Sequence, residues 1–476
     1  MLYTPNLQSP SNLPVYIALY EAIKRDIVGG KLRPSDRLPS IRALAKNLSI
    51  STTPVETAYQ QLIAEGFMES RPRRGFYITQ LPDSYGKLAL NDSTFSSLNF
   101  IPPEDAAPVY SYDFHMSKND FISFPLRAWR RLLNHTLLEE YKELLYYGDP
   151  LGEAGLRNEL AAYLYRFRGV VCRPEQIVIG AEQHLLMNYL AITMKDLSPG
   201  IAVENPCYPL IPYAFQAQGY ELFPVTEADK GISISRLGNT DARIVAVSPS
   251  HQFPGGRVMP FHERLELLEW AKENHAYIIE DDYGGELRYY GQPIPALQGL
   301  GSSANVIYVG GFSQILAPDL CIHYMVLPEA LLEPFRKITR RLMVELSSSR
   351  VYQRTLQRFM EQGHFEKHVR RMRNLYRKKN RKLADTLEVQ FQGVGEVMNA
   401  EAGLHLILKI RTPASEQEMV DAVRPYGIRV AAATPFYSDD KSQSGEKKFI
   451  IGFGGIELEK IEEGICRLRE LWSRYL

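Results

Sequence analysis

Residues 306–318, VIYVGGFSQILAP, decide the fold class of the long C-terminal part of this chain. The apolar run from Val306 to Val309 has the length of a buried strand, and the glycine pair that follows ends it. Comparable runs, each separated from the next by a helical stretch, stand at 176–180, 201–206, 243–250 and 276–283. This alternation predicts an α/β domain: a mostly parallel sheet with helices on both faces, followed by a smaller α+β section.

Polar residues stand directly after the predicted strands. In open α/β sheets, ligands bind at the carboxyl ends of the strands, so these residues mark the candidate ligand site. They are Glu182 and Gln183, Asn205 to Tyr208, Ser248 to Gln252, Asp281 to Tyr283, and Ser313 with Gln314.

The first 80 residues follow a different pattern, with three short helices and a hairpin. Pro14 begins the first helix, Ser40 caps the second, and Ser51 or Thr52 caps the third. Residues 67–79 then alternate as two strands around a basic turn. This order predicts a winged helix-turn-helix domain, whose third helix enters the DNA major groove.

The candidate DNA contacts lie on the second and third helices and in the basic turn. Capping explains a serine at a helix start, but it does not explain two adjacent arginines in a turn, whereas contact with DNA phosphates does. The candidates are Arg42, Ser51, Thr52, Thr53, Arg73, Arg74 and Gly75.

Charge balance, cysteine spacing and the length of the apolar runs indicate which class of protein this chain belongs to. The chain has 55 basic and 55 acidic residues, with a small basic excess in the first 80 residues. Its four cysteines lie far apart and outside zinc-binding spacings, which favours a reduced, cytoplasmic protein without a metal site. No apolar run is long enough to span a membrane. We expect a DNA-binding domain at 1–80, a linker rich in Ser, Pro, Asn and Asp at 81–112, and the α/β domain at 113–476.

Two features of the C-terminal half have simple structural explanations. His364 and His368 are one helical turn apart, but with a single Glu366 between them they lack the zinc-peptidase order, so a solvated helix face is expected. The basic run at 370–382 could touch DNA phosphates, although a charged helix face explains it better.

Several ordered motifs resemble a known family. KLRPSDRLPSIRALAKNLSIS and YQQLIAEGFMESRPRRGFYI resemble the GntR-type DNA-binding domain. YYGDPLGEAGLRNELAAYL, ENPCYP, SPSHQFPGG, IIEDDYGGELRYYG, YVGGFSQILAP and GHFEKHVRRMRNLYRKK resemble a fold-type-I aminotransferase as it occurs in MocR-type regulators. The resemblance implies a C-terminal domain that binds pyridoxal phosphate and senses an effector for the DNA-binding domain.

The resemblance also implies roles for the polar residues at the strand ends. Asp281 would protonate the pyridine nitrogen and Tyr283 would donate to the ring O3′. His251 or Gln252 would contact the ring, and Tyr208 would stack on it. Ser313 lies in the same implied pocket.

Three positions depart from the family pattern. The resemblance places the Schiff-base lysine at Gln314, whose amide is not nucleophilic. It places the phosphate-binding arginine at Cys321, and its glycine-rich phosphate turn carries the acidic Glu182 here. We therefore expect no catalytic residue, and we expect any pyridoxal phosphate that binds to be held without a covalent bond.

These observations favour one hypothesis and leave two others open. The favoured one is a homodimeric transcriptional regulator that binds double-stranded operator DNA and a small-molecule effector, and that is not an enzyme. The first alternative is an enzyme that uses pyridoxal phosphate non-covalently or without a lysine. The second is a scaffold that senses nothing and serves dimerisation.

Overall fold

The computed structural model describes residues 4–5, 14–81, 109–227, 231–289, 294–300, 305–342, 348–398, 401–437 and 445–476. The chain divides into two compact units, Met1–Pro108 and Val109–Leu476. Most of the predicted linker at 81–112 lies outside the described residues. Its last residue, Tyr112, begins the short strand β4 (Tyr112–Asp113) of the second unit.

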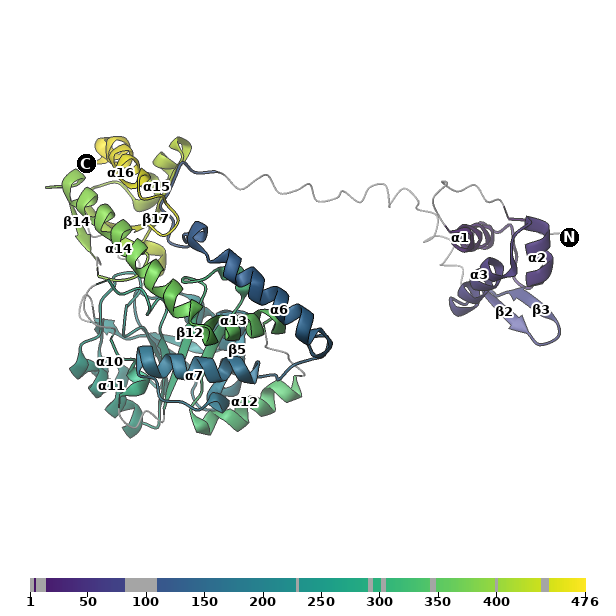
Figure 1. Cartoon of the computed structure of the whole chain (residues 1–476), viewed down its shortest axis with the longest axis horizontal. Coiled ribbons are helices and arrows are strands. Elements are labelled where there is room, and N and C mark those ends of the chain that lie inside the picture. The colour runs from purple at the N-terminus through teal and green to yellow at the C-terminus, as the bar shows by residue number, and fades with distance from the viewer. Residues whose placement is uncertain are drawn as a thin grey trace. The chain divides into compact units, whose positions relative to one another are not determined.

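The first unit contains three helices and a small antiparallel sheet (Figure 1). The side chain of Ser40 accepts a hydrogen bond from the Ala43 N–H and caps α2, as predicted. Ser51 stands at the N-cap position of α3, but its side chain makes no capping hydrogen bond. The sequence pattern did not predict β1, which pairs with β3 on the side opposite to β2. The elements are α1 (Val15–Val28), β1 (Arg37–Leu38), α2 (Ile41–Leu48), α3 (Thr52–Ala64), β2 (Met68–Arg71) and β3 (Gly75–Ile78).

The second unit is built on a seven-stranded sheet in the order β5-β13-β12-β11-β10-β6-β7. Only β13 runs antiparallel to its neighbours, so the prediction of a mostly parallel sheet is confirmed. The strands are β5 (Ile177–Gly180), β6 (Gly200–Val203), β7 (Glu221–Pro224), β10 (Ile244–Val247), β11 (Tyr277–Asp281), β12 (Val306–Gly311) and β13 (His323–Val326).

Helices cover both faces of this sheet because each strand is buried on both sides. In β11, Ile278 packs with α11 on one face, and Ile279 packs with α8 and α9 on the other. The first face also carries α7 and α13, and the second carries α12. These helices are α7 (Ala154–Arg168), α8 (Gln183–Thr193), α9 (Leu210–Ala217), α11 (Phe261–Glu273), α12 (Glu329–Arg341) and α13 (Arg350–Glu361). The short α10 (Ile234–Gly238), β8 (Thr226–Glu227) and β9 (Gly231–Ile232) lie between β7 and β10 along the chain.

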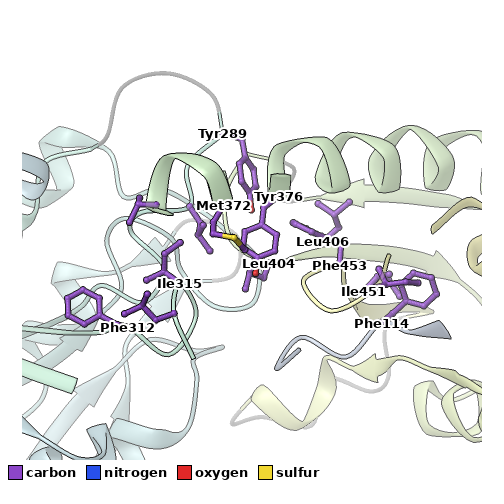
Figure 2. Close-up of a cluster of buried hydrophobic side chains, with 14 of the residues drawn as sticks. Phe114, Tyr289, Phe312, Ile315, Met372, Tyr376, Leu404, Leu406, Ile451 and Phe453 are labelled. Carbon is purple, nitrogen blue, oxygen red and sulfur yellow. The ribbon is translucent and has the colours of Figure 1, made fainter. Parts of the chain in front are cut away.

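The C-terminal section forms a four-stranded sheet in the order β14-β15-β18-β17, with helices packed on it. Figure 2 shows how its core continues into the main domain, with Met372 and Tyr376 of α14 lying between Ile315 and Leu406. The elements are α14 (His364–Gln390), β14 (Gly395–Met398), β15 (His405–Arg411), α15 (Glu416–Val423), β16 (Ile428–Arg429), β17 (Ala431–Ala432), β18 (Glu446–Gly452) and α16 (Lys460–Trp472). Helix α6 (Leu126–Leu144) packs on α13, and β16 pairs with β4.

Two expectations for α14 were wrong in part. His368 does not lie on a solvated face: it is buried, and its Nε2 lies 2.7 Å from the carbonyl oxygen of Ile315. The basic run at 370–382 is also not exposed throughout, because Lys379 is buried and forms an ion pair with Asp120 at 2.9 Å. Both residues tie α14 to segments distant in sequence, which a helix-face pattern does not reveal.

Candidate functional site

The predicted DNA contacts occupy three structural positions in the first unit: the first turn of α2, the start of α3 and the turn between β2 and β3. Arg42 lies in the first turn of α2, and Thr52 and Thr53 begin α3. Together with Ser51 and the two wing arginines, these side chains are exposed. Helix N-termini and exposed cations both favour contact with phosphate oxygens.

The wing is a tight turn between β2 and β3. The N–H of Arg74 donates to the carbonyl oxygen of Arg71 at 3.0 Å, and Arg73 takes a positive φ of 59°. Gly75 has a φ of 106°, which an L side chain rarely adopts, and the site of its missing Cβ lies 3.4 Å from the Nε of Arg37. Glycine therefore allows the tight turn next to the Arg37 side chain, and both arginines of the turn remain exposed.

The second candidate site lies at the carboxyl ends of the main sheet. Asp281 is the last residue of β11, and its Oδ1 accepts a hydrogen bond of 3.1 Å from the Nε2 of Gln183, which begins α8. Burial, with the neighbouring Asp282, raises the pKa of Asp281 to about 7. Two elements that are about 100 residues apart in sequence thus meet at this carboxylate.

Tyr283 turns toward a histidine at this site. Its hydroxyl lies 2.9 Å from the Nδ1 of His251, and the two rings are 5.4 Å apart. Gln252, beside this histidine, is buried, and its N–H donates to the carbonyl oxygen of Arg257 at 2.9 Å. The site of a Cβ on Gly403 lies only 2.5 Å from the His251 ring, so a segment of the C-terminal section passes closely over it.

Tyr208 lies on an aromatic cluster and keeps one surface open. Its ring stacks on Phe436 at 6.4 Å and meets the edge of Phe253 at 5.3 Å. The side chain remains 45% exposed. It can therefore contact a ligand from its open side, as a stacking role requires.

Gln314 is held by its backbone and has an unsatisfied side-chain oxygen. The Asn119 Nδ2 donates to the carbonyl oxygens of Ser313 at 2.7 Å and Gln314 at 3.1 Å. The Oε1 of Gln314 is buried and has no hydrogen-bond partner among the described residues, and it lies 2.6 Å from the site of a Cβ on Gly284. Sequence reasoning missed Asn119, because no local pattern connects positions nearly 200 residues apart.

A thiol and a carboxylate meet at the start of α8. The Sγ of Cys321 lies 3.8 Å from the Oε1 of Glu182, which is the N-cap residue of that helix. Burial, with Glu182 and Asp319 nearby, raises the pKa of the Cys321 thiol. A neutral thiol beside a carboxylate offers one weak donor and no positive charge.

A further buried carboxylate was not predicted. Glu204 is 4% exposed, and its Oε2 accepts a hydrogen bond of 2.9 Å from the Ser248 N–H. Burial, with Asp281 nearby, raises the pKa of Glu204 to about 7. The sequence signal for Glu204 was its position directly after β6 and directly before the polar run Asn205 to Tyr208.

The end of β11 is supported by a buried ion pair. The guanidinium of Arg168 binds both carboxylate oxygens of Asp282, at 2.6 and 2.8 Å, and the hydroxyl of Tyr308 also donates to this carboxylate. Both charged side chains are almost fully buried. Removing one partner would leave the other charge uncompensated, so the pair fixes the backbone next to Asp281.

In the described residues, the histidines, cysteines and carboxylates form no group of three or more that could hold a metal ion. The helices described are all too short or too polar to cross a membrane.

Comparison with known proteins places these sites in a family. Residues 15–78 match the model of the gntR family of bacterial regulatory proteins, and residues 113–465 match that of aminotransferase class I and II. An uncharacterized HTH-type transcriptional regulator of Bacillus subtilis (strain 168), YdeL, is 37% identical over 480 residues, which cover 99% of each chain. The probable rhizopine catabolism regulatory protein MocR of Rhizobium meliloti is 29% identical over 479 residues, which cover 97% of this chain and 94% of that protein.

Solved structures support the fold of the second unit. LysN, an α-aminoadipate aminotransferase from Thermus thermophilus complexed with N-(5'-phosphopyridoxyl)-L-leucine, aligns with a TM-score of 0.67 at 23% identity and covers 76% of this chain and 92% of its own. The chain belongs to the MocR-type branch of the GntR family of bacterial transcriptional regulators, with a helix-turn-helix domain joined to an aminotransferase class I and II domain.

Proposed function

We propose that this regulator binds operator DNA through its winged helix-turn-helix domain and binds an effector in its aminotransferase-like domain without forming a Schiff base. The observation that carries the second half of this proposal is the amide of Gln314, three residues after the end of β12, with its Oε1 buried and unsatisfied among the described residues. The exposed arginines of the wing support the first half.

The amide cannot replace an amine in imine chemistry. Its nitrogen is conjugated with the carbonyl group and does not attack an aldehyde. Because the resemblance puts the Schiff-base lysine at Gln314, no covalent adduct can form at that position. The chain is then a regulator and not an aminotransferase.

The residues near α8 do not fit the phosphate of pyridoxal phosphate. A dianion placed there would face the carboxylate of Glu182 and would gain only a weak donor from Cys321. Asp281 and Tyr283 are still the residue types that the resemblance places at the ring nitrogen and at O3′ of the cofactor. The ring side of the implied site is therefore retained, while the amine and the phosphate-binding groups are lost.

We also infer that the chain forms a homodimer through the end of α6 and the residues that follow it. Leu138, Leu145 and Tyr147 are 78%, 81% and 86% exposed, and such a concentration of exposed apolar side chains is typical of an interface. A second copy of the chain fits because helix-turn-helix readers bind paired half-sites as dimers. Leu138→Glu should shift sedimentation equilibrium toward monomer, whereas Val389→Glu, which charges an apolar residue that is 69% exposed on α14, should not.

Two measurements test the main proposal. In vitro selection from random duplex DNA should enrich a sequence with paired half-sites, and failure to enrich any sequence contradicts the DNA-binding half. Borohydride reduction in the presence of pyridoxal phosphate, followed by peptide mass spectrometry, should yield no pyridoxyl group on the peptide that contains Gln314. A stoichiometric adduct there contradicts the second half.

A further inference from the structure

A groove away from the strand-end site is lined by the charged groups that an amino acid requires. It lies between the C-terminal half of α7, the end of α13 and the start of α14, and it has a volume of about 700 Å³. This volume lies within the range of small-molecule pockets. Its floor is apolar, since Phe167, Met360 and Val369 line it. We call it the α7–α14 groove.

Three glutamates line the α7–α14 groove, Glu159, Glu361 and Glu366, and one of them has an unsatisfied oxygen. Burial and the two neighbouring carboxylates raise the pKa of Glu159. The Oε2 of Glu366 is buried and has no hydrogen-bond partner among the described residues, and its Oε1 reaches the Nη2 of Arg166 only at 3.4 Å. A buried carboxylate oxygen without a donor is unfavourable, and an ammonium group placed there would supply one.

The same groove is lined by three arginines, Arg166, Arg370 and Arg373. Arg370 stands one helical turn after Glu366 on α14, and Arg166 is ion-paired with Glu366. The Nε of Arg373 donates to the carbonyl oxygen of Glu286 at 3.0 Å, which anchors that guanidinium. Arg370 is exposed and forms no ion pair with any residue in the described ranges. Guanidinium groups bind carboxylates through paired hydrogen bonds, so Arg370 suits a carboxylate.

From this arrangement we propose that the α7–α14 groove binds a free α-amino acid, with its ammonium group against Glu366 and its carboxylate against Arg370. The apolar floor then receives the side chain of the ligand. None of the residues that line the groove belongs to the strand-end site around Asp281 and Gln314, so this proposal adds a second ligand site to the domain.

The binding test uses the full-length protein and the twenty L-amino acids as probes in isothermal titration calorimetry. The best binder is then compared with its decarboxylated amine and with its deaminated acid, each of which lacks one charge. Both analogues should bind at least about tenfold more weakly than the amino acid, because one leaves Glu366 and the other leaves Arg370 without its partner on the ligand. If no amino acid binds, or if the amine alone binds equally well, the proposal is wrong.

Variants locate the site. Glu366→Gln and Arg370→Ala should each weaken binding at least about tenfold. The matched control Arg381→Ala removes an exposed arginine further along the same helix and should leave binding unchanged. Binding that is insensitive to Glu366→Gln but lost in Asp281→Asn would assign the amino acid to the strand-end site. That outcome overturns the groove proposal and leaves the proposed function standing.

Discussion

Rebuilding the groups that pyridoxal phosphate requires gives the sharpest test of the strand-end site. The structure shows why Gln314→Lys alone is insufficient: the new amine would form an imine with a cofactor whose phosphate faces Glu182. Cys321→Arg adds a guanidinium, but the present Sγ lies only 3.8 Å from the Glu182 Oε1, so the arginine would pair with that carboxylate in competition with the phosphate. The triple variant Gln314→Lys/Cys321→Arg/Glu182→Gln removes this competing carboxylate and leaves the new arginine free to bind the phosphate.

The expected gain in affinity for pyridoxal phosphate follows from the number of charge-assisted hydrogen bonds that the phosphate gains. One such contact contributes about 1.5–3 kcal/mol, which corresponds to about 10- to 150-fold in the dissociation constant. Affinity for pyridoxal phosphate should therefore rise from Gln314→Lys to the double variant with Cys321→Arg, and again by a comparable factor on adding Glu182→Gln. The assay is visible absorbance of the imine in a titration with pyridoxal phosphate, followed by borohydride trapping and mass spectrometry.

A matched variant separates the phosphate contact from the imine. Gln314→Met/Cys321→Arg/Glu182→Gln has a side chain of similar length at position 314 but no amine. It should bind pyridoxal phosphate in calorimetry without the imine absorbance. Micromolar affinity of the unmodified protein, or equal affinity of Gln314→Lys and the triple variant, would refute the reasoning, because the phosphate would then be held by other residues.

Three further outcomes are expected. Arg74→Ala should weaken operator binding and lower the slope of log K against log salt by about one unit, as for one lost phosphate contact. The control Arg25→Ala, which removes an exposed arginine of α1, should change neither quantity. Fluorescence anisotropy at several salt concentrations measures both. The raised pKa of Glu204, about 7, means that the folded state holds a proton that the unfolded state releases near pH 4.5, so stability falls as pH rises through that interval. Glu204→Gln should reduce this fall by about 3 kcal/mol in urea denaturation at pH 4.5 and pH 8, and an unchanged pH profile would show that the carboxylate is not perturbed. Lys379→Met should destabilise the second unit by about 3 kcal/mol in the same assay, because it leaves the largely buried Asp120 carboxylate without its cation, and a change below about 1 kcal/mol would contradict this account.

Much of the architecture was predictable because its signals are local. The apolar run Val306–Val309 lies within one strand, as predicted, and Ser40 caps a helix through an N–H three residues away. The glycine pair does not end that strand, because β12 continues through both glycines, which pair with β13. The exposed arginines of the wing likewise follow from a turn of a few residues. The short strand β1 was missed because two residues carry no period.

The sequence by itself also determined which residue types stand at the strand ends, including Asp281, Tyr283 and the amide of Gln314. Only the tertiary structure decided what these groups contact. Gln183 reaches Asp281 across 98 positions, and Asn119 holds the Gln314 carbonyl across 195. Contacts of this kind depend on how crossover helices and a later sheet pack against the strands, and no pattern within one element records that packing. The buried histidine and lysine of α14 and the charge pattern of the α7–α14 groove have the same origin, because burial is a property of the packed chain and not of a local run of residues.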